Sequence, residues 1–423
     1  RPAAAGVDAN TSALYWLTSC FEGQAILQDL LDKNLTLATS ISGEALCRER
    51  PAAAGVDANT SALYWLTSCF EGQAILQDLL DKNLTLATSI SGEALCRERS
   101  AAAGVNANTS ALYWLTGSSE GQIILRDLLE KNPVLATSIS GEALCRERSA
   151  AAGVNANTSA LYWLTGSSEG QIILRDLLEK NPVLATSISG EALCRALPDA
   201  AEPHANTSAF WFTIPIDARI ILLDLLQQNP AQNPVSAADL GLEALYDPLT
   251  AAVGPNANTS ALYFLTTCSE GRAILATLLQ KNPVLTANIS GEALCRVLPA
   301  IAGVDANTSA LYYLAESPDG RRILKDLLRR HEGLASAITA EVLDRQLVGI
   351  HRGQSIYSQL NGNSDGREIL SQLYAVQPGL RETLERSQQR QSVVVINQAN
   401  MGLFSNRSSS SNSSNAPQSG SNP

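Results

Sequence analysis

A pattern of hydrophobic and polar positions that extends from Asn108 to Arg146 recurs from one end of the chain to the other. Within it, apolar residues stand three and four positions apart, which is the spacing of a helix with one buried face. No segment shows the sustained alternation of apolar and polar residues that a half-buried strand would need. The pattern therefore predicts an all-α fold with little or no β structure.

We expect three helices in each unit. The first begins at Asn108-Thr109-Ser110, whose short side chains can accept hydrogen bonds from unpaired first-turn N–H groups, and it ends near Gly117. The second begins at Ser119, which would form a capping box with Gln122. It ends at 131–133, Lys-Asn-Pro, where asparagine tolerates left-handed geometry and proline cannot continue the helix.

The third helix is shorter. It begins at Ser138 or Ser140 and carries Ala143, Leu144 and Cys145 inward. We expect it to continue through Arg146 into the alanines at the next junction. A unit of this size has too little apolar surface to bury alone, so the units are expected to stack on one another.

The period is 49 residues, and some copies are identical: residues 2–50 match 51–99, and residues 100–146 match 149–195. Such an array is an α-solenoid, elongated and curved, whose core lengthens with each unit. The expected boundaries are 1–50, 51–99, 100–148, 149–197, a divergent fifth unit at 198–249, 250–298, 299–347, a degenerate capping unit at 348–404, and a disordered Ser/Asn-rich tail at 405–423. Arg1 matches Arg50, which suggests that the sequence begins partway through a longer array.

The charge, the apolar runs and the cysteines of the chain limit the kinds of partner and compartment that are expected. The 30 Lys+Arg against 41 Asp+Glu give a net charge of −11, which disfavours binding to nucleic acid or to an anionic membrane. No apolar run approaches the roughly 20 residues of a membrane-spanning helix. The eight cysteines fall on two repeat positions without a CxxC or Cys/His cluster, so we expect reduced, buried thiols and a cytoplasmic protein.

The residues from Gly104 to Leu115, followed by Glu120 to Asn132, resemble an ankyrin repeat, with its first helix and a second helix that ends in a doubled leucine. The chain departs from that family because Ser110-Ala111-Leu112-Tyr113 stands where the family has Thr-Pro-Leu-His. The period of 49 instead of 33 leaves room for the extra helix, and we expect the projecting β-turn finger to be shortened or lost. A generic α-solenoid is the alternative fold.

The resemblance implies a non-catalytic scaffold, monomeric, that binds a protein partner on a concave face built from first helices and the loops before them. Its recent duplications are similar to those of effector proteins of intracellular bacteria, which would place it in a host cytosol. The alternative is a substrate-docking or regulatory arm of a larger enzyme whose catalytic domain lies upstream of Arg1. The sequence itself offers no catalytic, metal-binding or cofactor-binding set of residues.

Two groups of residues are candidates for partner binding. The loop position before each first helix varies between copies, and it lies where ankyrin-like arrays present recognition residues. The alternative is a solvated turn. This position is occupied by Asp8, Asp57, Asn106, Asn155, His204, Asn256 and Asp305.

The second group lies in the fifth unit, which departs most from the pattern. It would form an exposed patch that anchors a partner, because aromatic side chains dominate interface energetics. A drifted unit that bends the array explains the same residues. The members of the patch are Phe210, Trp211, Phe212, Ile214 and Ile216.

Tyr113-Trp114 and its copies form an aromatic ladder at repeat spacing. A stacking surface for a ligand is one reading, and packing between neighbouring first helices is the one we favour.

Overall fold

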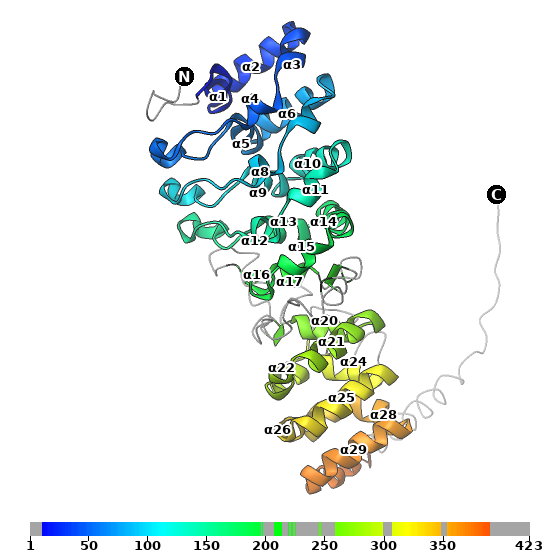
Figure 1. The fold of residues 1–423 in the computed structure, drawn as a ribbon. Helices are drawn as coiled ribbons and strands as arrows, with labels where there is room; N and C mark the ends of the chain where they lie inside the picture. The colour runs from blue at the N-terminus through cyan, green and yellow to red at the C-terminus, as the bar shows by residue number, and fades with distance from the viewer. Residues whose placement is uncertain are drawn as a thin grey trace, which may run out of the picture.

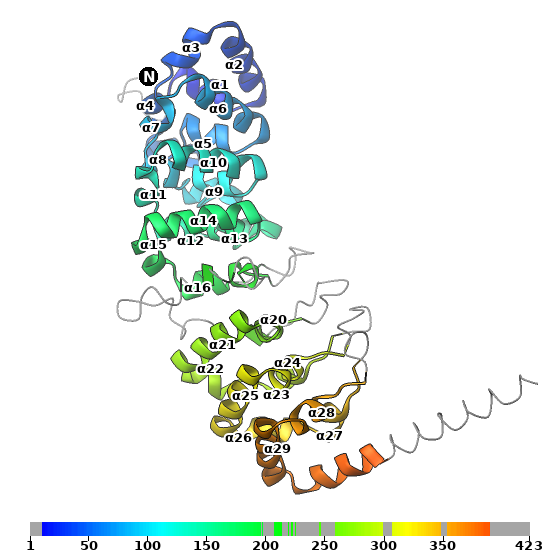
Figure 2. The same cartoon turned by 90° about the vertical axis from the view of Figure 1, so that its right-hand side faces the viewer.

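The computed structural model of the chain describes residues 11–195, 197, 207–213, 219, 221–222, 225, 245–246, 259–298, 307–347 and 353–389. These residues form helices joined by irregular segments, with no strand among them, which confirms the all-α prediction. The helices follow one another in one elongated stack (Figures 1 and 2). Within this part of the chain, we find no helix with the length and hydrophobicity to cross a membrane. The expected tail at 405–423 lies outside the described residues.

The same four helices recur along the stack. The first helices are α1 (Ala13–Thr18), α5 (Ala62–Thr67), α9 (Ala111–Thr116), α13 (Ala160–Thr165), α17 (Ala209–Phe212), α20 (Ala261–Thr266), α24 (Ala310–Glu316) and α28 (Ile356–Asn361). The second helices, which are the longest, are α2 (Phe21–Lys33), α6 (Phe70–Lys82), α10 (Ser119–Lys131), α14 (Ser168–Lys180), α21 (Ser269–Lys281), α25 (Pro318–Arg330) and α29 (Ser364–Val376).

Two short helices and a 3-10 turn complete a unit. The third helices are α3 (Leu35–Ser40), α7 (Leu86–Ser89), α11 (Val134–Ser138), α15 (Pro182–Ser187), α22 (Pro283–Ala287) and α26 (Glu332–Ala337). The fourth are α4 (Gly43–Cys47), α8 (Gly92–Cys96), α12 (Gly141–Cys145), α16 (Gly190–Cys194), α23 (Gly291–Cys295) and α27 (Ala340–Asp344). The described 3-10 turns are η2 (Ala52–Asp57), η3 (Ala101–Asn106) and η4 (Ala150–Asn155), and residues 378–389 form a further helix.

The prediction of three helices per unit was therefore wrong in its third member. Helix α11 lies where only a connection was expected, and Ile139 at its end has extended backbone geometry that separates it from α12. Ser140 caps α12 by accepting from Ala143 N–H at 3.1 Å. After Cys145 the chain becomes extended at Arg146 and does not continue as a helix into the alanines, which belong to the separate turn η4.

Each residue of the Asn-Thr-Ser triplet has its own structural role. Ser110 caps α9 as predicted, by accepting from Tyr113 N–H at 3.1 Å. Thr109 accepts or donates a 2.8 Å hydrogen bond with the Tyr64 hydroxyl of the preceding unit. Asn108 has a φ of 64°, in the left-handed region that asparagine tolerates. The triplet thus permits the turn before the first helix, starts that helix and joins two units.

The start of the second helix differs from the prediction by one residue. Ser118, not Ser119, is the N-cap and accepts from Gly121 N–H at 3.1 Å. Gln122 forms no capping box; its Nε2 donates to the Thr116 carbonyl at 2.7 Å, and its Oε1 accepts from Ser167 of the next unit at 2.8 Å. The glutamine therefore connects the first and second helices of its own unit and also binds the next unit.

The asparagine at the end of the second helix has a different role from the one predicted. Asn132 has a φ of −136°, outside the left-handed region. Its side-chain amide donates to the carbonyls of Ala87 and Ile90 in the preceding unit, at 3.1 and 3.3 Å. Asn83 and Asn181 make the equivalent bonds, so this position fixes the register between units.

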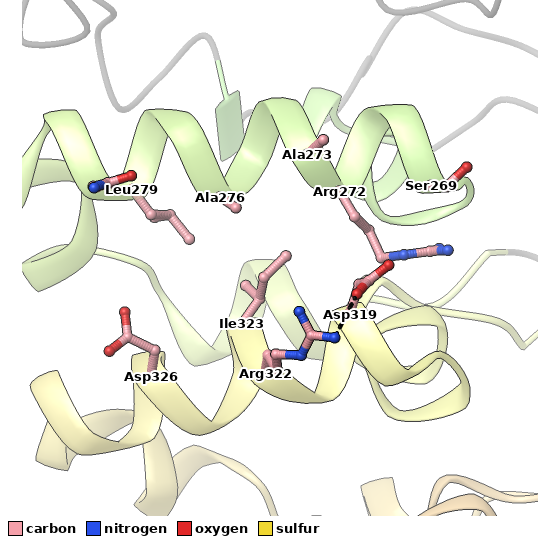
Figure 3. A pocket seen from close by; sticks show the side chains of 10 residues that line it. Ser269, Arg272, Ala273, Ala276, Leu279, Asp319, Arg322, Ile323 and Asp326 are labelled. Carbon is pink, nitrogen blue, oxygen red and sulfur yellow. Dashed lines mark ion pairs between the residues drawn. The ribbon is translucent and has the colours of Figure 1, made fainter.

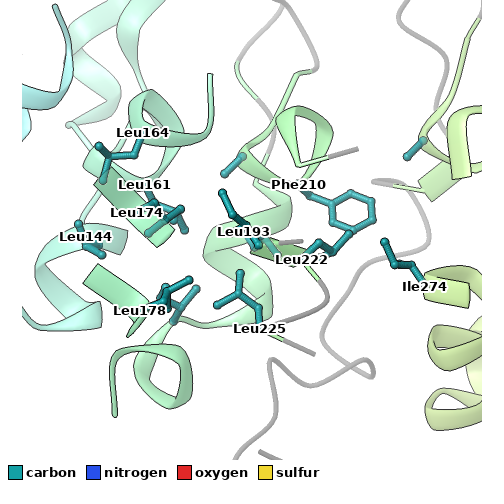
Figure 4. Packing of buried hydrophobic residues seen from close by; sticks show 14 of the residues in the cluster. Leu144, Leu161, Leu164, Leu174, Leu178, Leu193, Phe210, Leu222, Leu225 and Ile274 are labelled. Atoms are coloured by element: carbon teal, nitrogen blue, oxygen red, sulfur yellow. The ribbon is translucent and has the colours of Figure 1, made fainter. Parts of the chain in front are cut away.

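The core is one continuous column of leucine and isoleucine side chains. Figure 4 shows part of it, in which leucines of the third and fourth units pack toward Phe210 and Leu222 of the fifth. Leu125 and Leu128 of the second helix α10 are fully buried. Gly141 permits a close approach between units, because a Cβ there would lie 2.3 Å from Ser187 Oγ.

Removal of the asparagine bridge should weaken the stack. In Asn83→Ala, the carbonyls of Ala38 and Ile41 lose a buried donor, so we expect the free energy of unfolding to fall by about 1–3 kcal/mol. Urea denaturation followed by circular dichroism measures the change. Asn34→Ala is the control, because Asn34 is exposed and its side chain accepts only the capping bond from Leu37 N–H. Equal losses in both variants would contradict the bridging role.

Candidate protein-binding surfaces

A finger projects from the stack before each described first helix from the second unit to the fourth (Figure 1). Two backbone hydrogen bonds close its base: Arg99 N–H donates to the Thr109 carbonyl at 2.8 Å, and Asn108 N–H donates to the Arg99 carbonyl at 3.2 Å. Gly104 makes the turn with a φ of 60°. The finger that we expected to be shortened or lost is therefore present, with a 3-10 turn at its tip.

Neighbouring fingers pack against one another, η2 on η3 and η3 on η4. Their tips present small apolar side chains to solvent. Val56, Val105 and Val154 are 52–53% exposed, and the first two alanines of η2 and of η3 are exposed as well. We call these three stacked tips the finger ridge.

Arg99 and Arg148, at the bases of the fingers that carry η3 and η4, each join their finger to the preceding one. The Arg99 guanidinium lies 5.1 Å from the Trp65 ring centroid, in cation–π geometry. The same group donates to the Val56 carbonyl and to Asp57, both at 3.0 Å. Asp57 also accepts from Arg50 at 3.0 Å. The ridge is therefore held rigidly by contacts beneath its tips.

The structure shows what the variable loop position does in the described copies. Asp57 forms the two ion pairs just described, and Asn106 accepts from Arg148 at 2.7 Å. The Asn155 carbonyl accepts from Thr158 Oγ1 at 2.8 Å. All three residues are half-buried, and these contacts organise the fingers. The other four candidates, Asp8, His204, Asn256 and Asp305, lie outside the described residues.

Three members of the expected fifth-unit patch are described: Phe210 is buried, and Trp211 and Phe212 are half-buried. Phe210 is only 2% exposed and belongs to the core. Trp211 packs edge-on against Phe264 at 5.5 Å, and Phe212 packs edge-on against Tyr162 at 5.3 Å. Phe210 continues the core column, and Trp211 and Phe212 pack beside it while remaining half-buried. Ile214 and Ile216 lie outside the described residues.

The aromatic ladder is a packing device. Tyr113 is buried, its ring lies edge-on to Trp114 at 5.2 Å, and its hydroxyl is 2.7 Å from Thr158 Oγ1 of the next unit. Where arginine is absent from the finger base, Leu197 takes its place and packs with Tyr162 and Trp163. Packing between first helices was the favoured interpretation, and these contacts support it.

A groove that sequence reasoning missed lies between the second helices α21 and α25 (Figure 3). Its volume is about 470 Å³. Ala273, Ala276 and Leu279 line it from one helix, and Ile323 lies opposite them. Asp319 and Arg322 form an ion pair at one rim, with 3.3 Å between their charged atoms. The available signal was Ala276, because the first four units carry glutamine or arginine at this position.

None of the eight cysteines forms a disulfide in the structure. Cys20 is exposed and the others are half-buried, whereas full burial was predicted. Desolvation raises the pKa of the Cys96, Cys145 and Cys295 thiols from 9.0 to about 11. Such thiols are poor nucleophiles at neutral pH because little thiolate is present. No group of three or more potential metal ligands occurs among the described residues.

Comparisons with known proteins add no identity to this geometry, since no family model, curated protein or solved structure matches the chain. The surfaces must therefore be interpreted from their own residues.

Substitutions of Arg99 test whether the packing of its side chain or its charge stabilises the base of the finger. We expect Arg99→Ala to lower the free energy of unfolding by about 1–3 kcal/mol, because it removes the stacked stem and the cation–π contact. We expect Arg99→Leu to cost less than half as much, because Leu197, Leu298 and Leu347 stand at the equivalent position. Urea denaturation measures the free energy of unfolding of both variants. Equal losses of this free energy would show that the charge of Arg99, and not its packing, stabilises the base of the finger.

The raised pKa values of the Cys96, Cys145 and Cys295 thiols predict that the stability of the fold depends on pH. Between about pH 9 and about pH 11, unfolded thiols have lost protons that the folded protein still holds, so stability should fall as pH rises through this window. Urea denaturation at several pH values measures the slope. A variant with alanine at 96, 145 and 295 should show a shallower slope than the unmodified protein. An unchanged slope would mean that these thiols do not contribute.

Proposed function

We propose that the protein is a non-catalytic scaffold that binds a protein partner through the finger ridge and the first helices behind it. The observation that supports this most is the ridge itself. It carries exposed valine and alanine side chains on three adjacent, stacked tips. A contiguous group of exposed hydrophobic side chains is typical of an interaction surface, whereas isolated ones are common on any protein.

The ridge is suited to recognition because it is preorganised. The Asp57 ion pairs and the arginine bonds to the Val56 and Val105 carbonyls hold adjacent tips in register. A partner that binds such a surface does not have to order it first, and this reduces the entropic cost of association. No charged side chain interrupts the turns between 52 and 56, 101 and 105, or 150 and 154, so the expected contact is apolar at its centre.

A cytoplasmic location forms part of this proposal, and an effector protein inside a host cell is one form of it. The free cysteines support such a location, because reducing compartments keep thiols unpaired. The net charge of −11 supports a protein partner over nucleic acid.

A triple variant tests the ridge. Val56→Glu, Val105→Glu and Val154→Glu together place three charges on the proposed contact, so the amount of captured partner should fall at least about tenfold, equivalent to about 1.4 kcal/mol. Affinity capture from lysates with quantitative mass spectrometry measures it.

The matched control is Val134→Glu, Val183→Glu and Val284→Glu, which adds the same charges at valines that are 63–70% exposed on the third helices. The control should retain the captured proteins. Equal recovery by the two triple variants, with helix content unchanged, would rule out the ridge as the binding surface.

A further inference from the structure

The second helices of the first four units carry a band of exposed apolar side chains. Helices α2, α6, α10 and α14 lie side by side, on the side of the stack away from the fingers (Figures 1 and 2). The first and fifth residues of such a helix lie one turn apart on the same face. Each of the four helices has a large apolar side chain at one of these positions. These side chains, which we call the outer band, are Phe21, Phe70, Ile123 and Ile172, with exposed fractions of 63, 63, 48 and 47%.

Two rows of carboxylates accompany the outer band. The second residue of each of these helices is a glutamate, which lies next to the band in the first turn. The twelfth residue is aspartate or glutamate, and it lies near the other end of the same face, since Glu130 follows Ile123 by seven residues, or about 10 Å. The first row is Glu22, Glu71, Glu120 and Glu169, and the second row is Asp32, Asp81, Glu130 and Glu179. All of them except the half-buried Glu169 are exposed.

This surface stays negative after its own ion pairs are counted. The four helices have twelve acidic and six basic residues, a net charge of −6. Five of the basic residues are already ion-paired on this surface, and the exposed Arg175 is the exception within the described part of the chain. The paired ones are Lys33, Lys82, Arg126, Lys131 and Lys180. The carboxylates that form no ion pair with any described residue are Glu22, Glu71, Asp81, Glu120, Glu130 and Glu179.

The second helices of the sixth and seventh units lack both features. The twelfth residue is Gln280 in α21 and Arg329 in α25, so the second row of carboxylates does not continue. The fifth residues are Ala273 and Arg322, and neither helix has a large apolar side chain at its first or fifth position. The combination of apolar band and acidic rows therefore belongs to the first four units and is not a general property of the second helix.

Bridges between neighbouring helices hold this surface in register. Gln77 of α6 donates to Asp127 of α10 at 3.3 Å. Arg126 of α10 pairs with Glu169 of α14 at 2.5 Å. Gln77 and Arg126 are the eighth residues of their helices, between the outer band and the second row of carboxylates. A partner would therefore meet a surface that is already ordered, which lowers the entropic cost of binding.

From these observations we infer that the second helices of the first four units bind a basic amphipathic helix of a partner protein, which lies along the stack with its apolar face on the outer band. Packed helices are about 8–10 Å apart, and residues seven apart on one face of a helix are separated by about 10 Å. A helix with apolar side chains in each heptad therefore meets each unit in turn. Its lysine and arginine side chains face the unpaired carboxylates, and this charge complementarity favours encounter and orientation.

The test uses the full chain and a fluorescent synthetic peptide of about 22 residues, roughly 33 Å long as a helix. Leucine stands at every third or fourth residue along one face, with lysine beside that face and glutamine elsewhere. Fluorescence anisotropy measures the Kd. We expect binding at least about tenfold tighter than for a scrambled peptide or for one with glutamate in place of lysine. Equal binding of the lysine peptide and its scrambled form would overturn the inference, because charge alone would then explain the attraction.

The first variant removes the outer band with residues that the chain itself uses at these positions. Serine is the first residue of α10 and alanine is the fifth residue of α2, so the fold and the charge should be retained. We expect at least about a tenfold loss of peptide affinity with unchanged circular dichroism. Unchanged affinity would overturn the site. The substitutions are Phe21→Ser, Phe70→Ser, Ile123→Ala and Ile172→Ala.

The second variant removes the second row of carboxylates by copying the glutamine of α21. We expect at least about a tenfold loss of peptide affinity and a weaker dependence of affinity on salt. The substitutions are Asp32→Gln, Asp81→Gln, Glu130→Gln and Glu179→Gln.

The matched control removes four charges from the fourth helices, where the glutamate side chains are 74–81% exposed. Peptide affinity should change by less than about twofold at physiological ionic strength, because distant exposed charges are screened. Equal losses in the control and in the second variant would show a general attraction between charges and would overturn the site. The control substitutions are Glu44→Gln, Glu93→Gln, Glu142→Gln and Glu191→Gln.

This surface is separate from the finger ridge, so the inference does not depend on the function proposed for the ridge. The variant with glutamate at 56, 105 and 154 should lose the captured partner and still bind the basic peptide, so failure of the ridge and failure of this surface are distinguishable. A second copy of the chain is the competing occupant, which light scattering over a range of protein concentrations detects. Self-association that the outer-band variant abolishes would replace the partner helix with a second copy. A concentration-independent monomer that binds the basic peptide supports the proposal.

Discussion

The fold depends on the burial of each unit's leucines by the unit next to it. The first unit makes this visible: Ile26 and Leu30 are 54% and 41% exposed, whereas their counterparts Ile75 and Leu79, which pack against the first unit, are 2% and 0% exposed. The same side chains on the same helix therefore gain their stabilisation only from a neighbour. Hydrogen bonds between units then fix how neighbours align, since the asparagines that follow α6, α10 and α14 reach carbonyls 42 to 45 residues earlier in the chain.

Much of this could be predicted from the sequence, because the period and the leucine spacing are local signals. The second helices and the first-helix caps were found for that reason. Helix α11 was missed because Asn132-Pro133 is a stop signal for one helix, and here the proline is also the residue that precedes the next. The role of Asn132 was misassigned because its partners are distant in sequence, and sequence spacing carries no information about which carbonyls a stacked neighbour leaves unpaired.

The candidate sites also combine local features, which the sequence predicts, with contacts between distant residues, which it does not. Asp57 varies in a loop, which suggested recognition, but its ion pairs with Arg50 and Arg99 could be known only once two fingers were placed side by side. Phe210 suggested an exposed patch because it replaces a leucine, although a larger apolar residue at a core position of a divergent unit is also what buried packing permits. The α21–α25 groove was open to discovery from the sequence, since Ala276 replaces a glutamine or arginine of the first four units. Its consequence required knowing that Gln77 and Arg126 bridge adjacent helices.

An array of identical units would present the same surface at every step. The chain avoids this through substitutions that leave the core column intact. Glutamine on the buried side of the second helix gives way to Arg272 and Arg321, which still donate to the end of the first helix at 2.7 and 2.9 Å. Arginine at the finger base gives way to Leu197 and Leu298, which are still buried. Each exchange preserves a contact and changes the local charge. The net charge of the second helices also differs along the stack, from −2 in α2 and α6 to +1 in α21 and +3 in α25.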